Sequence, residues 1–291
     1  MDAGSRTYLY NFDNMAVALL QYQPLPLDPD ANRAKIAKFL RDPSLRPGDL
    51  VILPETATLP FHPELASAES GDTPLAAAIE SMFLEDELLF RKMARERGIY
   101  LLAGLCDARE TYGQWRNLAV LFDPEGKALF EYQKIHLFHV AGEAQAFVAG
   151  DKPPVAVPAA GHKLMAGICF DLRFPETYRA QPQKDFTALV NIANWPASRA
   201  EHFDVLARAR AIENQSWLFA VNITGRVRNT DYAGGSMIVS PKGEVILNTG
   251  REEGLFTAAA DPDLARAWRE KFPVDLERRP ASFWSTGQSP N

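Results

Sequence analysis

Cysteine is scarce in this chain of 291 residues, which contains only Cys106 and Cys169. Two cysteines do not make a disulfide framework, so nothing indicates an oxidising compartment, and we expect a cytoplasmic protein. No apolar run approaches the roughly 20 residues of a membrane-spanning helix. Residues 1–14 lack the apolar core of a signal peptide. We interpret them as an extension or leader, with Met15 as a possible natural start.

Positive charge and the common binding motifs are also lacking. The chain has 31 Lys and Arg residues against 37 Asp and Glu residues, a net charge of −6, and no basic run of five or more. Nucleic acids and anionic membranes attract basic patches, so we expect neither as a partner. Glycine-rich nucleotide motifs are absent, and the five histidines show no metal-ligand spacing. We therefore expect neither a metal site nor a nucleotide-binding module.

Strand-like and helix-like segments alternate along the chain. The expected strands are 16–22, 50–53, 99–104, 188–192 and 218–222, and the expected helices are 31–41, 74–97, 200–214 and 262–272. The segments 119–129 and 237–247 are both typical of hairpins with a Pro-x-Gly turn, which indicates two related halves packed face to face. Because no low-complexity linker divides the chain, residues 15–291 are predicted to form one domain of mixed sheets with helices outside. The C-terminal tail, which contains Pro273 and Pro280, is predicted to be extended.

The most informative stretch is Gly-Ile-Cys-Phe-Asp-Leu-Arg-Phe-Pro-Glu, residues 167–176. The apolar residues before Cys169 predict a buried strand, and Phe-Pro-Glu predicts a turn that opens a helix. Backbone N–H groups converge at such a junction and favour a thiolate. A lone cysteine is more often a buried structural residue. Cys169 therefore becomes a candidate nucleophile only through the residues that accompany it.

Two other strand ends carry candidate residues. Glu55 directly follows the strand 50–53, where partial burial suits a carboxylate to proton transfer; the alternative is a surface or helix-capping acid. Lys134 lies inside the apolar and aromatic run FEYQKIHLF, where it either extends to solvent or occupies a polar pocket. Glu, Lys and Cys in this order and at these junctions are difficult to attribute to chance.

The combination resembles the nitrilase superfamily of carbon–nitrogen hydrolases, whose catalytic set is Glu-Lys-Cys. The matching pieces are Leu-Pro-Glu55, Tyr-Gln-Lys134-Ile-His-Leu-Phe, CFDLRFPE from Cys169 and the region 191–222, and the resemblance runs from about residue 16 to residue 258. It implies a four-layer α-β-β-α sandwich. It also implies a second glutamate after the lysine, and Glu143 matches this position, from which it would hydrogen-bond Lys134.

The resemblance further implies hydrolysis of a linear amide through a thioester, without a cofactor. Cys169 attacks the amide carbon, while Lys134 and the backbone N–H of Phe170 stabilise the oxyanion. Glu55 accepts the thiol proton, passes it to the departing ammonia and then activates water. Lys134 is also expected to lower the pKa of the thiol.

Within the superfamily the sequence looks most like the bacterial omega-amidases, which hydrolyse 2-oxoglutaramate and similar short dicarboxylic monoamides. The likeness lies in Asn194-Trp195-Pro, Arg199 and the run ARAIENQ from residue 209. It implies that Asn194, Trp195 and Arg199 bind the substrate together with Phe170. Arg199 would pair with the far carboxylate, the alternative being a surface arginine. Trp195 and Phe61 would line the pocket; the alternative is that they are ordinary residues of the hydrophobic core.

Two other arginine positions bear on the pocket. We interpret Arg173 as structural, paired with a buried acid such as Asp171 or Glu176. Ile223 stands where the omega-amidases usually carry an arginine, and Arg226 and Arg228 come later in the chain.

Other functions remain possible on the same residues. A nitrilase or a carbamoyl-amide hydrolase would keep the same triad and change only the pocket. A non-catalytic scaffold could share the fold, but a scaffold has no physical need for all three residues of the triad. The resemblance also implies a homodimer or higher homo-oligomer, in which the tail 261–280, with Phe272, Phe283 and Trp284 nearby, reaches over a partner.

Overall fold

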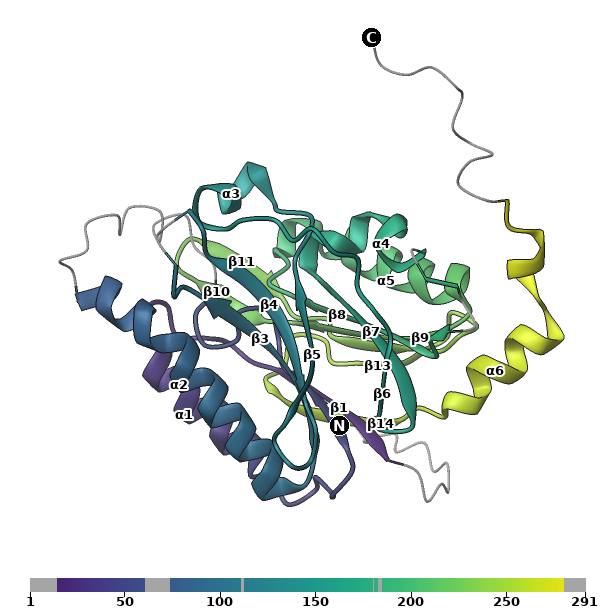
Figure 1. Ribbon diagram of the computed structural model, residues 1–291, viewed down its shortest axis with the longest axis horizontal. Coiled ribbons are helices and arrows are strands. Elements are labelled where there is room, and N and C mark those ends of the chain that lie inside the picture. The colour runs from purple at the N-terminus through teal and green to yellow at the C-terminus, as the bar shows by residue number, and fades with distance from the viewer. Residues whose placement is uncertain (1–14, 61–73, 111–112, 180, 183–184, 280–291) are drawn as a thin grey trace, which may run out of the picture.

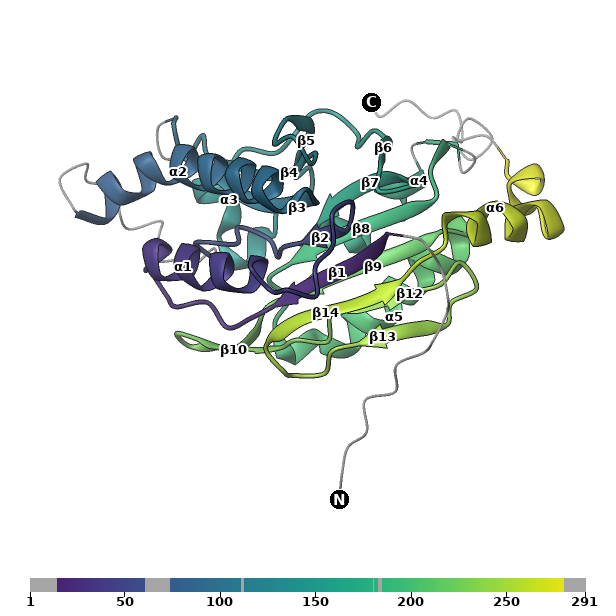
Figure 2. The same cartoon turned by 90° about the horizontal axis from the view of Figure 1, so that it is seen from below.

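The computed structural model describes residues 15–60, 74–110, 113–179, 181–182 and 185–279. Two six-stranded sheets lie face to face, with helices on their outer faces (Figure 1, Figure 2). The helices α1 (Pro29–Leu40) and α2 (Pro74–Arg97) cover one sheet, and α4 (Pro175–Arg179) and α5 (Ala200–Asn214) cover the other. The predicted four-layer α-β-β-α sandwich is therefore confirmed.

The first sheet contains β1 (Ala16–Gln21), β2 (Leu50–Ile52), β3 (Tyr100–Asp107), β4 (Arg116–Phe122), β5 (Ala128–Gln133) and β14 (Gly254–Ala259). Its strand order is β14-β1-β2-β3-β4-β5. The strands β1, β2 and β3 run parallel. At one edge β14 pairs antiparallel with β1, and at the other β4 and β5 continue antiparallel from β3.

The second sheet contains β6 (Val157–Ala159), β7 (His162–Ile168), β8 (Ala188–Ala193), β9 (Trp217–Asn222), β12 (Met237–Val239) and β13 (Val245–Asn248). Its order is β13-β12-β9-β8-β7-β6, with β7, β8 and β9 parallel and the others antiparallel to their neighbours. Both sheets thus have three parallel strands between one antiparallel strand and an antiparallel hairpin. This equivalence agrees with the two related halves that the sequence predicted.

Alternate residues of the central strands face opposite layers, as the two-residue period of a strand requires. In β1, Val17 and Leu19 pack between the two sheets, whereas Ala18 and Leu20 pack against α1 and α2. A strand that is buried on both faces needs a continuous apolar run. This explains why AVALL and LVIL were recognisable as strands from the sequence.

Sequence signals also define the helix ends. The Asp28 side chain accepts a hydrogen bond from the Ala31 backbone N–H at 2.9 Å and caps α1, which begins at Pro29. Gly98 follows α2 with a φ of +64°, a conformation that glycine adopts without a steric penalty. Within the described ranges, no helix has both the length and the apolar composition needed to cross a membrane.

The C-terminal part departs from the expectation of an extended tail. After α6 (Pro262–Lys271), residues Val274–Glu277 form the 3-10 helix η6, which closes where the Arg278 backbone N–H donates to the Asp275 carbonyl. The leader at residues 1–14, together with Pro280, Phe283 and Trp284 of the tail, lies outside the described residues. The division of the chain into leader, domain and tail therefore stays a prediction.

Candidate active site

The predicted catalytic residues come from strand ends that meet at one edge of the sandwich. Glu55 follows β2, Cys169 follows β7, and Lys134 follows β5. Side chains beyond the carboxyl ends of parallel strands converge on one crevice. Because the two sheets lie face to face, these side chains line a single cavity of about 160 Å³.

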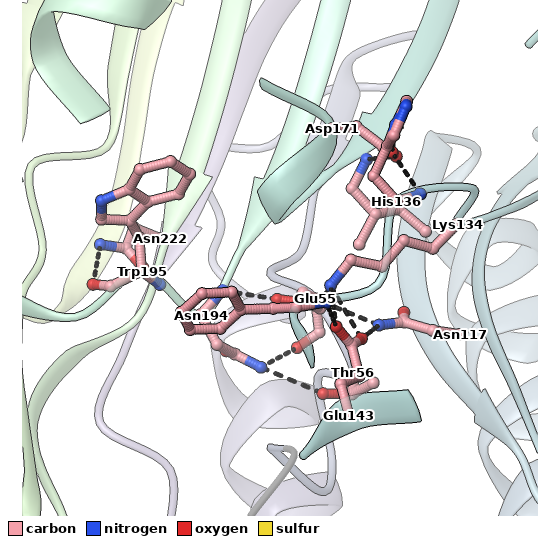
Figure 3. Close-up of polar contacts among 12 residues, drawn as sticks. Glu55, Thr56, Asn117, Lys134, His136, Glu143, Asp171, Asn194, Trp195 and Asn222 are labelled. Carbon is pink, nitrogen blue, oxygen red and sulfur yellow. Dashed lines mark hydrogen bonds and ion pairs between the residues drawn. The ribbon is translucent and has the colours of Figure 1, made fainter. Parts of the chain in front are cut away.

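Glu55 is held from several sides (Figure 3). Its side chain is buried, and Lys134 Nζ and Asn117 Nδ2 each donate to Oε1 at 2.8 Å. The Asn194 backbone N–H donates to Oε2 at 2.8 Å, and the Asn194 side chain donates to the Glu55 carbonyl at 3.1 Å. Glu55 is thus a fixed interior carboxylate and not a surface or helix-capping acid.

Lys134 lies between two carboxylates and does not extend to solvent. Its side chain is 2% exposed, and Nζ lies 2.8 Å from Glu55 Oε1 and 2.8 and 2.9 Å from the two oxygens of Glu143. Glu143 opens the short helix α3 (Glu143–Ala146) and accepts a hydrogen bond from the Phe138 backbone at 2.7 Å. Burial alone lowers the pKa of Lys134, but Glu143 and Glu55 raise it well above its ordinary value. The predicted contact between Glu143 and Lys134 is confirmed.

Cys169 begins the 3-10 helix η3 (Cys169–Arg173) directly after β7. Its φ of +46° lies in the left-handed region, which non-glycine residues rarely occupy outside special turns. The side chain is half-buried and lines the cavity. This geometry presents the sulfur to a ligand from a rigid, strained turn.

The protonation state of Cys169 corrects one expectation. Burial, and next the Glu55 carboxylate, raise the pKa of the thiol well above its usual value. Lys134 lowers it, as predicted, but its charge does not outweigh these effects. The thiol is therefore favoured over the thiolate that the strand-to-helix junction predicted, and attack needs a base, the role that the sequence assigned to Glu55.

Sequence reasoning missed Asn117, which joins the two carboxylates. Its Nδ2 donates to Glu55 Oε1 at 2.8 Å and to Glu143 Oε1 at 3.1 Å. The backbone carbonyl of Asn117 accepts a hydrogen bond from the Lys134 backbone N–H at 2.9 Å. This bond aligns β4 with the segment that contains Lys134. The only signal in the sequence was a polar residue inside the apolar strand RNLAVLF.

The structural interpretation of Arg173 is wrong. Asp171 does not contact it and accepts hydrogen bonds from Ile168, Tyr132 and His136. Arg173 instead lines the cavity, where its guanidinium lies 4.8 Å from the centroid of the Trp195 ring. The cause is the tight 3-10 turn, which sends Asp171 into the interior and Arg173 to the cavity.

Arg173 and Arg199 form a cationic end of the cavity. Arg199 also lines it, 5.3 Å from the centroid of the Phe138 ring. Among the described residues, no carboxylate lies within ion-pair distance of either guanidinium. Burial and the neighbouring charge of Arg199 lower the pKa of Arg173. Two cations without an acid between them favour an anionic ligand.

All predicted site residues that the structure describes line this cavity, including Phe170, Asn194 and Trp195. Phe61 lies outside the described residues. Tyr232, on β11 (Thr230–Ala233), also lines the cavity and was missed. Ile223 is fully buried and packs against Tyr232, so it is not a lining residue.

The polar groups of the cavity indicate acyl chemistry. The cavity combines a thiol, an ammonium group and two carboxylates, which suits nucleophilic attack with proton transfer. In the part of the chain that the structure describes, no three His, Cys, Asp or Glu side chains are grouped so as to hold a metal ion.

Comparison with known proteins gives a consistent result. Residues 16–270 match the family model of carbon–nitrogen hydrolases. The chain is 31% identical to the 2-oxoglutaramate amidase of Bacillus subtilis strain 168, over 89% of this chain and 95% of the relative. It is also 31% identical to the omega-amidase YafV of Escherichia coli strain K12, over 93% of this chain and 99% of the relative.

Solved structures show the same fold. XC1258 from Xanthomonas campestris, a CN-hydrolase superfamily protein with an arsenic adduct in its active site, superposes with a TM-score of 0.78 at 28% identity, covering 92% of this chain and 98% of the other. An amidase from Nesterenkonia sp. gives a TM-score of 0.77 at 26% identity, covering 94% of this chain and all of the other.

Proposed function

Because the chain belongs to the carbon–nitrogen hydrolase family, we propose that it is an omega-amidase that releases ammonia from short dicarboxylic acid monoamides such as 2-oxoglutaramate. The pair of arginines in the same cavity as Cys169 carries this proposal. Such a substrate has an amide at one end and a carboxylate at the other. Arg173 and Arg199 bind the carboxylate, which leaves the amide carbon facing the thiol.

The first half-reaction forms the thioester. Glu55 takes the proton of the Cys169 thiol as Sγ bonds to the amide carbon, and the carbonyl oxygen becomes an oxyanion. Lys134 Nζ and the Phe170 backbone N–H stabilise that oxyanion. When the C–N bond breaks, Glu55 passes its proton to the nitrogen and ammonia leaves.

The second half-reaction releases the acid. Glu55 takes a proton from water as the water oxygen bonds to the thioester carbon, and the same donors stabilise the second oxyanion. The C–S bond then breaks, and the proton on Glu55 returns to the sulfur. Glu143 keeps Lys134 in place throughout, and Asn194 and Trp195 shape the wall beside the acyl chain.

The location and assembly of the enzyme are part of the same proposal. A cytoplasmic enzyme fits a protein in which Cys106 and Cys169 are both free thiols. A homodimer or higher homo-oligomer fits the apolar side chains that the C-terminal part exposes, namely Phe272, Val274 and Leu276.

The decisive experiment measures ammonia release from 2-oxoglutaramate, with Cys169→Ala run in parallel. We expect turnover by the parent enzyme and a loss of at least ~10³-fold in the variant, because no other group can form the thioester. Cys106→Ala is the matched control, since Cys106 is a buried thiol outside the cavity.

Other outcomes separate the alternatives. No ammonia from 2-oxoglutaramate, with thioesters captured by mass spectrometry on nitriles or carbamoyl amides, would reject the substrate and keep the hydrolase chemistry. No thioester on any of these compounds would reject the catalytic roles given to Glu55, Lys134 and Cys169.

A further inference from the structure

Asp171 is a buried carboxylate that hydrogen-bonds His136, two residues after Lys134 (Figure 3). Its side chain is fully buried, and no Lys or Arg among the described residues lies within ion-pair distance of it. Its Oδ2 accepts hydrogen bonds from the Ile168 backbone at 2.9 Å and the Tyr132 hydroxyl at 2.8 Å. Its Oδ1 accepts the His136 backbone N–H at 3.1 Å and lies 2.8 Å from His136 Nδ1, which therefore carries a hydrogen.

The donors of these hydrogen bonds are close in sequence to both Cys169 and Lys134. Ile168 directly precedes Cys169, whereas Tyr132 and His136 lie two residues before and two residues after Lys134. The nucleophile turn follows β7 of the second sheet, and the lysine segment follows β5 of the first. A single carboxylate therefore joins the two segments across the interface between the sheets.

Burial makes this junction rigid. A hydrogen bond to a carboxylate is stronger than one between neutral groups, and a buried carboxylate that loses a donor is not compensated by water. A shift of either segment breaks at least one of these bonds. The His136 ring also stacks on Phe174, with the ring centroids 3.9 Å apart and the planes 11° from parallel. The stack limits rotation of the imidazole away from Asp171.

Oxyanion stabilisation depends on this kind of rigidity. A donor is effective when it lies ~2.7–3.1 Å from the oxyanion, and a misplacement of ~1 Å can cost about 10²-fold in rate. Glu55 and Glu143 anchor the tip of Lys134, but among the described residues neither carboxylate forms a hydrogen bond with Cys169. Asp171 is bonded on both sides of the lysine and next to the nucleophile.

We propose that Asp171 is a positioning residue that fixes Cys169 and Lys134 relative to each other, in the arrangement that oxyanion formation needs. It acts through these two residues and does not touch the substrate. The inference rests on the proposed roles of Cys169 and Lys134, but it does not depend on which amide is the substrate.

The test compares two reactions of the same sulfur in Asp171→Asn. Acylation by p-nitrophenyl acetate forms the C–S bond through an oxyanion and expels p-nitrophenolate, whereas alkylation by iodoacetamide displaces iodide without an oxyanion. We expect acylation to fall ~10–100-fold, because one oxygen is replaced by an NH2 group that cannot accept. Alkylation, located at Cys169 by mass spectrometry, is expected to change less than ~3-fold, because it needs no oxyanion donor.

Two further variants make the test decisive. Tyr132→Phe removes one hydrogen-bond donor to Asp171 without changing the charge, and it is expected to lower the acylation rate by a smaller factor than Asp171→Asn. If Asp171→Asn does not fold, Tyr132→Phe serves as the test variant. Asp49→Asn is the matched control, because Asp49 is a buried carboxylate that accepts the Ala16 and Arg46 backbone N–H groups, both at 2.8 Å, away from the cavity.

Two results would overturn the proposal. One is acylation within ~3-fold of the parent, less than the cost of a misplaced donor. The other is an equal loss in acylation and alkylation, which would assign Asp171 a structural role alone. Neither reaction uses the proposed amide. The comparison of acylation with alkylation can therefore still be interpreted if the ammonia assay fails.

Discussion

Lys134 carries its charge where an isolated ammonium would cost several kcal/mol to bury. Two carboxylates and the Asn117 bridge offset that cost, so the group holds one net negative charge around a fixed ammonium. Burial of the Cys169 thiol, and next the Glu55 carboxylate, raise the pKa of that thiol well above its usual value. The carboxylates that stabilise the lysine therefore also disfavour the thiolate, which is why the proposed mechanism needs Glu55 as a base.

The arginines lead to a prediction about selectivity. Arg173→Met should lower kcat/KM for a monoamide with a far carboxylate by ~10–100-fold, because a charge-assisted contact of about 1.5–3 kcal/mol is lost. An uncharged amide of the same length should be hydrolysed within ~3-fold of the parent rate, since it makes no such contact. Steady-state kinetics with both amides measure this difference.

The control for this prediction is Arg226→Met. Arg226 is an exposed arginine that does not line the cavity, so its loss should affect neither amide. An equal loss of kcat/KM for both amides in Arg173→Met would show that Arg173 supports the cavity wall and does not bind the carboxylate of the substrate.

Some of these residues could be predicted from sequence, and others could not. Glu55, Lys134 and Cys169 follow segments with clear strand or turn patterns and match an ordered motif. Asn117 and the true partners of Asp171 depend on which strands meet across the sandwich. No local pattern contains that information, so the natural guess was to pair Asp171 with the nearest arginine.

At the scale of elements, β3 supports the turn that carries Glu55. A Cβ at Gly104 would lie 2.3 Å from the Pro54 carbonyl oxygen and 2.7 Å from Glu55 Cα, both backbone atoms. We expect Gly104→Ala to destabilise the protein by ~1–3 kcal/mol, the usual cost of overpacking. It should also lower kcat, because the turn must move. Denaturant unfolding and the kcat of the folded fraction measure the two effects.

Ala103→Gly provides a matched control in the same strand. Ala103 is fully buried against the outer helices, so this change should cost a similar ~1 kcal/mol of stability without reaching Glu55. Parent-like kcat in Gly104→Ala would contradict the argument, since it would mean that the Glu55 turn absorbs the added methyl group.

The elements themselves were more predictable than their contacts. Strands such as β1 and β8 are buried on both faces and are therefore mainly apolar, and helices such as α5 have the expected length. The hairpin of β10 (Thr224–Val227) and β11 was missed because its residues alternate in burial only weakly and its turn lacks a glycine.

At the scale of the whole molecule, the exposed apolar side chains near the C-terminus predict self-association. Phe272 is 57% exposed and Leu276 is 80% exposed, on a segment that projects from the sandwich in Figure 1. Light scattering at micromolar concentration should give at least twice the 32.3 kDa mass of one chain. A mass of a single chain would contradict this prediction, and Leu276→Glu should shift the mass towards that value.

The pairing of β1 with β14 has a consequence for biosynthesis. Gln21 pairs with Gly254, so β1 is synthesised well before its outer neighbour β14. At ~5–20 residues per second, translation separates the two by roughly 10–50 s. Throughout that interval the nascent β1 has a free edge that strands of neighbouring polysomal chains can join. We therefore expect yield in the cell to depend on protection of this edge during synthesis as well as on the stability of the finished enzyme.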